Sequence, residues 1–502
     1  MTCFREEPKK AHFIIVPLPA QGHLIPMTDM GCLLAERGVC VSLVITRANA
    51  DRIRPIMERA KESNISFEFI ELSFPNEKFG LPPGCESIDH ITDTGLFRAF
   101  FDAIYSLNEP LETFIESLER PPDCMITDMC NAWTAPVARK FGIPRVIFHG
   151  PSCFYISTDY NLVRHKVYDS VSNENEYVTV PNFPIKLQVT KAQTPGFLNS
   201  PRFEDFRKKS LEEELTADGV VINTFLELER PFIKNYERMI GKKVWTVGPF
   251  CLYNKDDEMK VSRGNKDAID QRHRVLTWLD RREALSVLYI SFGSIVYTNP
   301  QQLMEIGRAL EASNKPFIWV MKKREMTPVV KKWLAEGFEE RTKDRGLIIV
   351  GWAPQVVILS HPAVGGFMTH CGWNSLLEAI STGVPMITWP RIADQFVNEN
   401  LVVDVLRIGI SLGVKVPNFG IEHVIMVKSE EIRKAVDVLM DGIEADKRRQ
   451  RSKDFSEKAK KAVEEGGSSY VNLTDFIHYF TEARSELAMP HANSIIAHNL
   501  LF

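Results

Sequence analysis

Short apolar runs alternate with amphipathic stretches through the first half of the chain. Four of these runs have the length of buried strands, at residues 12–17, 39–45, 124–127 and 145–149, and a helix is predicted at residues 26–37. Alternation of this kind is typical of a parallel sheet covered by helices. Because open α/β sheets bind ligands at the carboxyl ends of their strands, functional side chains are expected just after these runs.

The alternation resumes after residue 270. The second series predicts a helix around residues 275–279, a strand at 287–292, a helix at 300–313, and strands at 317–320, 347–350 and 364–369. Between the two series, residues 253–270 are rich in Lys, Asp, Glu, Asn and Gly and have no periodicity, which is typical of an exposed linker. The charge-rich segments 322–345 and 446–465 are interpreted as solvated helix faces.

Length limits the architecture. A chain of 502 residues exceeds what one hydrophobic core usually supports, so two domains of about 200 to 250 residues are expected. The simplest architecture is an α/β fold with two Rossmann-like, doubly wound parallel-sheet domains that face each other across a cleft. A hydrophobic content of 44% and a charged content of 25% are ordinary for a soluble globular protein.

Net charge and cysteine usage narrow the functional classes. A net charge of −4 gives no reason to expect a nucleic-acid partner, which normally needs a basic face. The nine cysteines are odd in number and include no Cys-x-x-Cys pair, which favours a reducing compartment. No apolar run approaches the ~18 residues that a membrane helix needs. We therefore expect a cytoplasmic monomer without an integral membrane segment.

The densest polar and aromatic chemistry surrounds one predicted helix. After the strand at residues 364–369, Gly372 frees the backbone for a sharp turn into a helix that begins near Asn374 or Ser375. Gly383 ends this helix after about two turns. Its N-terminus has unpaired N–H groups and a partial positive charge, so it suits a phosphate without help from a metal ion.

Side chains in neighbouring loops have the chemistry to complete a nucleotide-sugar site. Trp352 can stack on a base, and Glu378 can accept hydrogen bonds from ribose hydroxyls. Asp394 and Gln395 can do the same for a hexose. These side chains extend the predicted phosphate site toward both ends of a nucleotide sugar.

Purely structural interpretations also exist for single residues. Ser375 and Glu378 stand three apart, so they would also suit a capping box at the helix start. Core packing would account for the tryptophans, which are Trp352, Trp373 and Trp389. A cap leaves several polar or amphipathic residues around the helix mouth unexplained, namely His370, Trp373, Asp394 and Gln395. The combination therefore favours a ligand site.

Two residues in the first half have the chemistry of a base and its partner. His23 lies after the first strand, in the loop before its helix, and histidine can take a proton from a hydroxyl near neutral pH. Asp128 follows the strand at residues 124–127, where its carboxylate can stabilise the protonated imidazole. From spacing alone, His23 would equally suit a structural or exposed position, and Asp128 a plain loop or cap.

These residues belong to a longer pattern. It opens with Trp-Ala-Pro-Gln at residues 352–355, continues with His-Cys-Gly-Trp-Asn-Ser at 370–375 and closes with Gln395. This pattern resembles the signature box of the plant family 1 UDP-glycosyltransferases. Other landmarks of that family are similar to residues 22–23, 245–249 and 291–294. The likeness therefore covers most of the chain.

The resemblance implies a GT-B fold and assigns roles to individual residues. His23 matches the family's catalytic base, and Asp128 matches its partner. The residues that match the UDP-sugar site are Ser294, Trp352, Ala353, Gln355, His370, Trp373, Asn374, Ser375, Glu378, Asp394 and Gln395. No Asp-x-Asp motif occurs in the chain, which disfavours the metal-dependent transferase fold. We therefore expect a UDP-sugar as donor substrate, without a metal or other cofactor.

The same resemblance bears on the donor sugar. In the family a closing Gln goes with glucose, so Gln395 points to UDP-glucose. Glucuronate-using relatives often carry an arginine in this part of the site, where this chain keeps Trp373. Arg391 stands where the family commonly has an apolar residue, which counts somewhat against a simple glucose assignment.

The resemblance also gives expected domain limits. They are residues 1–252 for an N-terminal acceptor-binding domain with the catalytic base, 253–270 for the linker, 271–471 for a C-terminal UDP-sugar-binding domain, 472–485 for a helix that crosses back to the N-terminal domain, and 486–502 for a disordered tail.

Four apolar residues at helical spacing are interpreted as core packing instead of an acceptor wall; they are Phe97, Phe100, Phe101 and Ile104.

The expected activity is inverting transfer of a sugar, glucose first, from the UDP-sugar to a hydroxyl of a small lipophilic plant metabolite. Residues 181–184, Pro-Asn-Phe-Pro, most resemble the subgroup acting on flavonoids, terpenoids and hormones. Two alternatives stay open at this point. One is a catalytically silent GT-B protein that binds a nucleotide sugar or another small molecule. The other is a different GT-B enzyme, such as a phosphorylase or a sugar epimerase.

Overall fold

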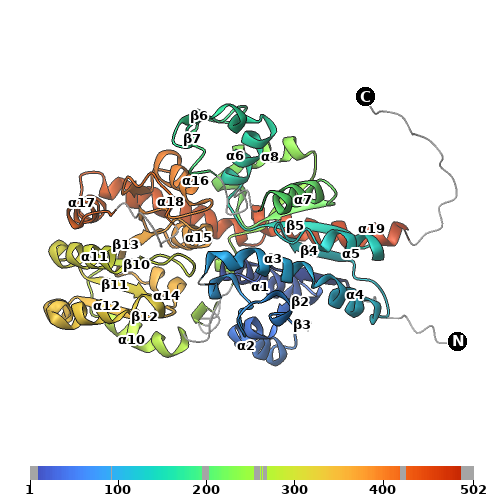
Figure 1. Ribbon diagram of the computed structural model, residues 1–502, viewed down its shortest axis with the longest axis horizontal. Coiled ribbons are helices and arrows are strands. Elements are labelled where there is room, and N and C mark those ends of the chain that lie inside the picture. The colour runs from blue at the N-terminus through green and yellow to red at the C-terminus, as the bar shows by residue number, and fades with distance from the viewer. Residues whose placement is uncertain are drawn as a thin grey trace.

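The computed structural model describes residues 10–91, 93–194, 203–253, 260–261, 263, 268–418 and 426–487. Two parallel sheets lie side by side along the long axis of the molecule, and helices cover both (Figure 1). Most of the expected linker at residues 253–270 and almost all of the expected tail at residues 486–502 lie outside the described residues.

The N-terminal sheet has seven parallel strands in the order β3-β2-β1-β4-β5-β8-β9. Their bounds are β1 His12–Val16, β2 Cys40–Thr46, β3 Phe67–Leu72, β4 Cys124–Asp128, β5 Arg145–His149, β8 Gly219–Ile222 and β9 Val244–Thr246. The helices of this half are α1 Gln21–Glu36, α2 Arg47–Glu62, α3 Phe97–Tyr105, α4 Asn108–Glu116, α5 Thr134–Phe141, α6 Cys153–Arg164, α7 Glu204–Glu214 and α8 Leu226–Ile240. A separate antiparallel hairpin consists of β6 Tyr177–Thr179 and β7 Gln188–Thr190.

The C-terminal sheet has six parallel strands in the order β12-β11-β10-β13-β14-β15. Their bounds are β10 Val287–Ser291, β11 Phe317–Met321, β12 Gly346–Val350, β13 Val364–Thr369, β14 Met386–Thr388 and β15 Gly409–Ser411. The helices of this half are α10 Ile269–Leu279, α11 Pro300–Ser313, α12 Pro328–Trp333, α13 Glu339–Thr342, α14 Gln355–Leu359, α15 Trp373–Thr382, α16 Gln395–Asn400, α17 Ser429–Met440, α18 Ala445–Val463 and α19 Ser468–Leu487.

The central strands are buried along their whole length. Every residue of β4, β5, β10 and β13 is buried, because helices cover both faces of each sheet. This is why these strands appear in the sequence as continuous apolar runs and not as alternating ones. The predicted α/β fold class, with two parallel-sheet domains, is confirmed. The expected core helix is also confirmed, since Phe100, Phe101 and Ile104 are buried and the half-buried Phe97 packs against the same cluster.

The limits of most predicted elements are close to those observed. Strand β5, helix α11 and strand β13 match their predictions to the residue. Helix α1 differs, because it begins at Gln21, five residues before the predicted start at Pro26. A proline is favoured at the first helical position, which is why the pattern placed the start there. In the structure Pro26 lies inside the helix instead.

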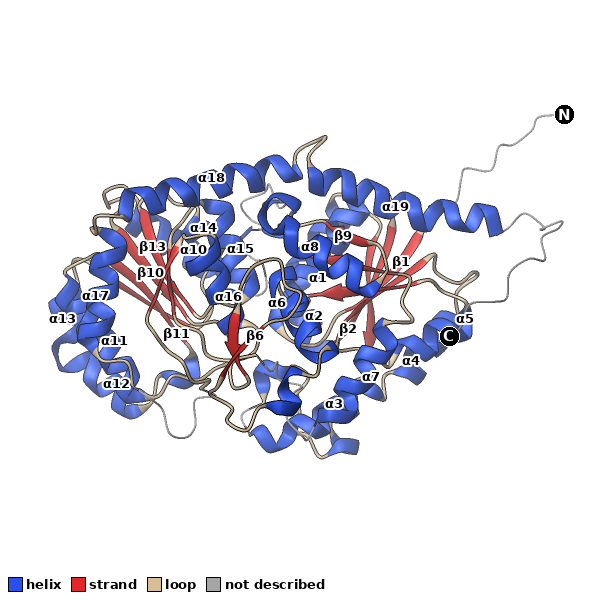
Figure 2. Cartoon of the chain, turned by 90° about the horizontal axis from the view of Figure 1, so that it is seen from above, coloured by secondary structure: helices blue, strands red, loops and turns tan. Residues whose placement is uncertain are grey.

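The last helix lies on the N-terminal half. Phe476 of α19 packs edge-on against Phe13 of β1 and Trp245 of β9, with ring centroids 6.0 and 5.2 Å apart. The indole N–H of Trp245 donates to Asp475 Oδ2 at 2.7 Å. Helices α18 and α19 follow one another along one side of both halves (Figure 2). The C-terminal end of the described chain is therefore built into the first core.

Each sheet has a point where the strand order reverses. Strand β1 pairs with β2 on one side and β4 on the other, and β10 pairs with β11 and β13 in the same way. The loops after such central strands leave toward opposite faces and open a crevice at the carboxyl edge. Most of the predicted site residues follow these four central strands, and the others follow β12 and β14 of the C-terminal sheet.

Candidate active site

The structure brings the predicted catalytic pair into contact. His23 Nδ1 lies 2.6 Å from Asp128 Oδ2. Asp128 is the last residue of β4, and His23 lies in the first turn of α1, not in the loop where the sequence pattern placed it. Because β1 and β4 pair in parallel, the start of α1 and the end of β4 meet at the same edge of the sheet.

Asp128 sets both the orientation and the charge of the imidazole. Its carboxylate is fully buried, and Oδ1 accepts a hydrogen bond from the backbone N–H of Cys130 at 2.9 Å. Burial lowers the pKa of His23, but the attraction of the Asp128 carboxylate and its hydrogen bond outweigh burial and leave the pKa raised above its usual value of 6.5. With Nδ1 directed at Asp128, Nε2 is left to accept a proton from a hydroxyl.

The N-terminus of α15 follows the turn after β13. The helix begins at Trp373, and the residue before it, Gly372, supplies no side-chain cap. Ser375 therefore lies inside the first turn and is not the capping residue. The capping-box interpretation of Ser375 and Glu378 is wrong, and the first N–H groups of α15 have no side-chain cap.

Ser375 and Glu378 share one hydrogen-bonding partner. Gln355 Nε2 donates to Ser375 Oγ at 3.0 Å and to Glu378 Oε2 at 2.7 Å. The other carboxylate oxygen of Glu378 pairs with the Arg263 guanidinium, which also pairs with Asp29 at 2.7 Å. The side chains of Arg263, Asp29 and Glu378 are 7%, 4% and 6% exposed. The carboxylate predicted to hold ribose is thus held by a cation that also reaches α1.

His370 lies between two glycines at the end of β13. A Cβ at Gly293 or at Gly372 would lie 2.5 Å from His370 Nε2, so neither position has room for a side chain. Nδ1 of His370 is buried without a hydrogen-bond partner. Burial and the positive charges of Lys322 and Arg391 lower the pKa of His370 to about 3. The ring is therefore neutral and carries a nitrogen free to bond a ligand.

Asn374 connects the two halves of the protein. Its Nδ2 donates to the backbone carbonyl of Gly22 at 2.6 Å. That carbonyl has no intrahelical partner, because the residue four positions later is Pro26, which lacks an N–H. The Oδ1 atom of Asn374 is buried without a partner. One side-chain amide thus joins α15 to the turn that carries His23 and keeps an oxygen for a ligand.

The tryptophans of this region differ in environment. Trp373 is 3% exposed, and its N–H donates to the backbone carbonyl of Asn223 at 2.8 Å, so its ring belongs to the packing between the two halves. Trp389 is 2% exposed and packs against Phe292 with ring centroids 5.3 Å apart. Core packing therefore accounts for these two. Trp352 is only half-buried, in the loop after β12, and its stacking on a base stays a prediction.

Asp394 and Gln395 lie at the start of α16. Gln395 Oε1 accepts hydrogen bonds from the backbone N–H groups of Arg391 and Ile392 at 2.9 and 3.0 Å, which leaves its Nε2 to donate to a ligand. Asp394 Oδ2 accepts from Asn398 Nδ2 at 2.7 Å. Burial raises the pKa of Asp394 to about 6. The negative charge of Asp394 helps to raise the pKa of His23, so the two side chains interact electrostatically.

Ser294 and Ala353 complete the predicted set. Ser294 Oγ donates to Asp89 Oδ1 at 2.9 Å, which joins the loop after β10 to the N-terminal half. Asp89 is in turn paired with Arg52 at 3.1 Å. Ala353 is 8% exposed and packs in the core beneath the site. Every predicted residue therefore lies at or next to the carboxyl edges of the two sheets.

Comparisons with known proteins identify the family to which this geometry belongs. The profile described as UDP-glucoronosyl and UDP-glucosyl transferase matches residues 271–416, and the profile described as glycosyltransferase, N-terminal domain, matches residues 9–252. UDP-glycosyltransferase 73E1 of Stevia rebaudiana is 43% identical over 96% of this chain and 98% of its own length. This chain belongs to the plant family 1 UDP-glycosyltransferases.

Other relatives of this glycosyltransferase agree. UDP-glycosyltransferase 73C3 of Arabidopsis thaliana is 45% identical over 92% of this chain and 95% of its own length. The crystal structure of UGT73P12 of Glycyrrhiza uralensis, complexed with glycyrrhetinic acid 3-O-monoglucuronide, superimposes with a TM-score of 0.88 at 35% identity, covering 96% of this chain and 97% of its own. The GT-B fold and the transfer of a sugar from a UDP-sugar follow from these likenesses.

Arg391 is the residue of the signature box that departs from the family pattern. Its side chain is 3% exposed and lies over the rings of Phe292 and Trp389, 5.0 and 4.7 Å from their centroids. Its Nε and Nη2 atoms are buried without hydrogen-bond partners. Burial lowers the pKa of Arg391 to about 10, so the guanidinium stays charged at neutral pH. The C-terminal half of this glycosyltransferase therefore contains a buried cation at Arg391.

Two residues of the site were not predicted from the sequence. Arg263 lies in the segment interpreted as a linker and gave no signal beyond its charge. Asn398 accepts from Ser152 Oγ at 2.7 Å and donates to the backbone carbonyl of Cys371 at 3.0 Å, besides its bond to Asp394. It follows Asp394 by one helical turn, and that spacing was the available signal.

Metal ligands and membrane helices were also sought in the described part of this glycosyltransferase. Its His, Cys, Asp and Glu side chains form no cluster of three or more that could hold a metal ion. In the part of the chain that the structure describes, no helix is both long enough and apolar enough to cross a membrane.

Proposed function

We propose that this UDP-glycosyltransferase transfers glucose from UDP-glucose to a hydroxyl of a small lipophilic plant metabolite, with inversion at the anomeric carbon. The observation that supports this most strongly is the 2.6 Å contact between His23 and Asp128. This contact lies at the carboxyl edge of the N-terminal sheet. A hydrogen bond of 2.6 Å from Asn374 to the Gly22 carbonyl connects that edge to the start of α15. In this proposal the N-terminal domain binds the acceptor and the C-terminal domain binds the donor.

The proposed reaction is a direct displacement. Nε2 of His23 takes the proton of the acceptor hydroxyl, whose oxygen attacks the anomeric carbon as the bond to the UDP oxygen breaks. The sugar passes to the acceptor with inverted configuration, and UDP carries the electron pair away. The buried Asp128 carboxylate stabilises the imidazolium that forms.

Charge on the departing diphosphate is offset by the second domain. The uncapped N-terminus of α15 offers N–H groups, and His370 Nδ1 is a buried nitrogen without a hydrogen-bond partner. The positive charges of Lys322 and Arg391 act on the same neighbourhood, since both lower the pKa of His370. We propose that these groups do the work of a cation and that neither a metal nor another cofactor is needed. Full turnover in the presence of EDTA is the expected result.

Glucose is proposed as the donor sugar on the state of Gln395 and Asp394. The Gln395 amide oxygen is occupied by the loop backbone, which directs its N–H₂ group toward a sugar hydroxyl. The half-buried Asp394 carboxylate can accept from a second hydroxyl. UGT2 of Phytolacca americana, whose structure contains UDP-2fluoro-glucose and pterostilbene, is 27% identical over 94% of this chain and 100% of its own, with a TM-score of 0.74.

A flavonoid, terpenoid or hormone is proposed as the acceptor class. The proposal is supported by the resemblance of residues 181–184 to the subgroup that acts on these compounds and by the bound ligand named for UGT73P12. We also propose a cytoplasmic location, because the cysteines at described positions, Cys32, Cys40, Cys85, Cys124, Cys130, Cys153, Cys251 and Cys371, are all free thiols.

The decisive experiment measures UDP release and product mass together. Purified protein is incubated with UDP-glucose and panels of phenols, triterpenes and hormones, and products are identified by mass spectrometry. A gain of one hexose on an acceptor, with stoichiometric UDP, supports the proposal. Binding of UDP-glucose without product from any panel would identify the protein as a silent binding protein instead.

A further inference from the structure

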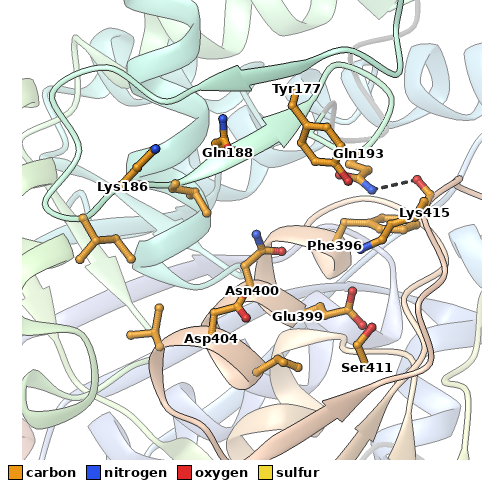
Figure 3. A pocket seen from close by; sticks show the side chains of 14 residues that line it. Tyr177, Lys186, Gln188, Gln193, Phe396, Glu399, Asn400, Asp404, Ser411 and Lys415 are labelled. Atoms are coloured by element: carbon orange, nitrogen blue, oxygen red, sulfur yellow. Dashed lines mark hydrogen bonds between the residues drawn. The ribbon is translucent and has the colours of Figure 1, made fainter.

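A second cavity lies between the two domains, apart from the candidate active site. It has a volume of about 550 Å³ and is bounded by the β6–β7 hairpin on one side and by α16 and the residues after it on the other (Figure 3). None of the predicted catalytic or UDP-sugar residues lines it. Its volume falls within the range of roughly 300 to 1,000 Å³ that is usual for small-molecule sites.

Helix α16 separates this cavity from the donor site. Phe396, Glu399 and Asn400 of the helix line the cavity, and Val403, one turn further, continues the same face. Asn398 is directed the other way, to the backbone of Cys371 and to Ser152. The cavity is therefore a neighbour of the active site across one helix and not an extension of its lining.

Two of the three amide side chains that line the cavity make no hydrogen bond to another described residue. Gln188 of β7 and Asn400 of α16 lie on opposite walls, and neither side chain makes a hydrogen bond to another described residue. Gln193 Nε2 donates to the backbone carbonyl of Lys415 at 2.8 Å and so joins the two walls at one end, as Figure 3 shows. Uncommitted amides on both domains present donors and acceptors to a ligand that bridges them.

Charge and shape define the class of ligand. Lys186 and Lys415 are balanced by Glu399 and Asp404, so the lining carries no net charge and gives no preference for a phosphate or a carboxylate. Apolar side chains, including Phe396, alternate with the polar ones. Amides that offer both donors and acceptors, next to apolar surface and without excess charge, match a ring that has hydroxyls at its edge and C–H groups on its faces.

We propose that this cavity is a second ligand site, which binds the neutral sugar part of a glycoside and bridges the hairpin of the N-terminal domain to α16. The site is independent of the acceptor identity and of the proposed donor preference. Its natural occupants would be compounds that already carry a sugar, the class of product that a glycosyltransferase forms. Loss of catalytic activity would leave this site intact.

The experiment uses ligand-observed NMR on the full chain with the nucleotide site filled by excess UDP. The probe is cellobiose, a neutral disaccharide, and the comparison ligands are glucuronate and glucose 6-phosphate. We expect saturation transfer to cellobiose that persists in His23→Ala and exceeds transfer to either anion. Gln188→Leu and Asn400→Leu should each weaken cellobiose binding roughly fivefold or more, since each removes paired hydrogen bonds.

The matched control is Gln450→Leu, the same change at an exposed amide on α18. Gln188 is exposed and Asn400 half-buried, so both variants should keep wild-type melting temperature and UDP affinity. The proposal is overturned if UDP displaces cellobiose, if both cavity variants bind it like the control, or if an anionic sugar binds better. A crystal soaked in cellobiose gives an independent check, and density outside the cavity would also overturn it.

Discussion

His23 depends on one carboxylate for its chemistry. The imidazole has a side-chain exposure of 25%, whereas Asp128 beside it has none. The buried carboxylate of Asp128 contacts one nitrogen of the ring and leaves the other for the proposed role as a base. The same principle applies to Gln395, because the loop backbone occupies one end of its amide and so directs the other.

Replacement of His23 by alanine should separate binding from catalysis. The His23→Ala variant loses the proposed base, so kcat should fall by roughly 10² to 10⁴. UDP affinity should stay near wild type, because the nucleotide is proposed to bind the other domain. Calorimetry with UDP and the UDP-release assay test this together, with His361→Ala, at a surface pair with Asp280, as control. Collapse of UDP binding would contradict the role given to His23.

The pH profile should reveal the influence of Asp128. A base must be neutral, and the pKa of His23 is raised above 6.5, so kcat/KM should fall as pH drops through that raised value. In Asp128→Asn the attraction that raises the pKa is lost and burial, which lowers it, remains. The acidic limb should then move to lower pH while kcat decreases. An unmoved limb would show that another group sets it.

Gln395→His tests the donor assignment. Histidine at this position cannot accept both backbone N–H groups and still donate in the same direction, so kcat/KM for UDP-glucose should fall several-fold relative to UDP-galactose. The ratio of the two donors in one competition assay is the measurement. An unchanged ratio would remove Gln395 from donor selection.

At the level of elements, the site depends on the turns that follow β10 and β13. Gly293 has a φ of +67°, and a Cβ there would lie 2.5 Å from His370 Nε2. A Cβ at Gly372 would lie at the same distance of 2.5 Å from His370 Nε2. These glycines allow the two turns to close around His370, which places a neutral ring beside the start of α15. Pro26 also shapes the site, because it has no N–H to donate to the Gly22 carbonyl. That carbonyl accepts a hydrogen bond from Asn374 instead.

Gly293→Ala should therefore affect both stability and nucleotide binding. The positive φ alone costs about 1 to 2 kcal/mol for a residue with a Cβ, and the displaced His370 should weaken UDP binding as well. Gly413→Ala is the control, since Gly413 has a φ of +75° with nothing within 4 Å of the added Cβ. Thermal denaturation and UDP calorimetry distinguish them. Equal UDP affinity in the two variants would show that the His370 contact is unimportant.

Several of these elements could be predicted because their signals are local. Strand β13 and helix α11 were located to the residue by a run of apolar residues and by a proline start with helical spacing. The start of α1 was misplaced because Pro26 imitates a first helical residue. A proline inside a helix leaves one backbone carbonyl without its helical donor, so another donor is needed. Here that donor is Asn374, which is 352 residues away from Gly22 in sequence.

At the scale of the whole molecule, the two domains are joined by contacts that pass through the site. The guanidinium of Arg263 pairs with Asp29 of α1 and Glu378 of α15, all three buried. Ser294 bonds to Asp89, also across the two halves. Residues predicted to bind the donor therefore also make contacts between the two halves.

Arg263→Met should show how much the buried ion group contributes. The variant leaves Asp29 and Glu378 buried without their shared cation, so stability should fall by about 3 to 5 kcal/mol at pH 7. Urea denaturation at pH 7 is the measurement.

Arg433→Met provides the comparison for Arg263→Met. Arg433 pairs with Asp437 at 2.8 Å on the surface of α17, where both side chains are more than 40% exposed. An exposed pair of this kind contributes at most about 1 kcal/mol. Equal losses in the two variants would contradict a buried clamp at Arg263.

By itself, the sequence determined the fold class and most strands and helices, since burial on both faces of a strand and the start of a helix leave local patterns. The donor box and the catalytic pair were predicted from the resemblance of motifs to those of the family, and their roles stay predictions. The 2.6 Å contact of His23 with Asp128, the Arg263 bridge, the committed indole of Trp373 and the second cavity were decided only by tertiary structure. Each of these features joins segments that are far apart in the chain. The residues around a side chain in the sequence do not show whether it contacts a distant segment or water.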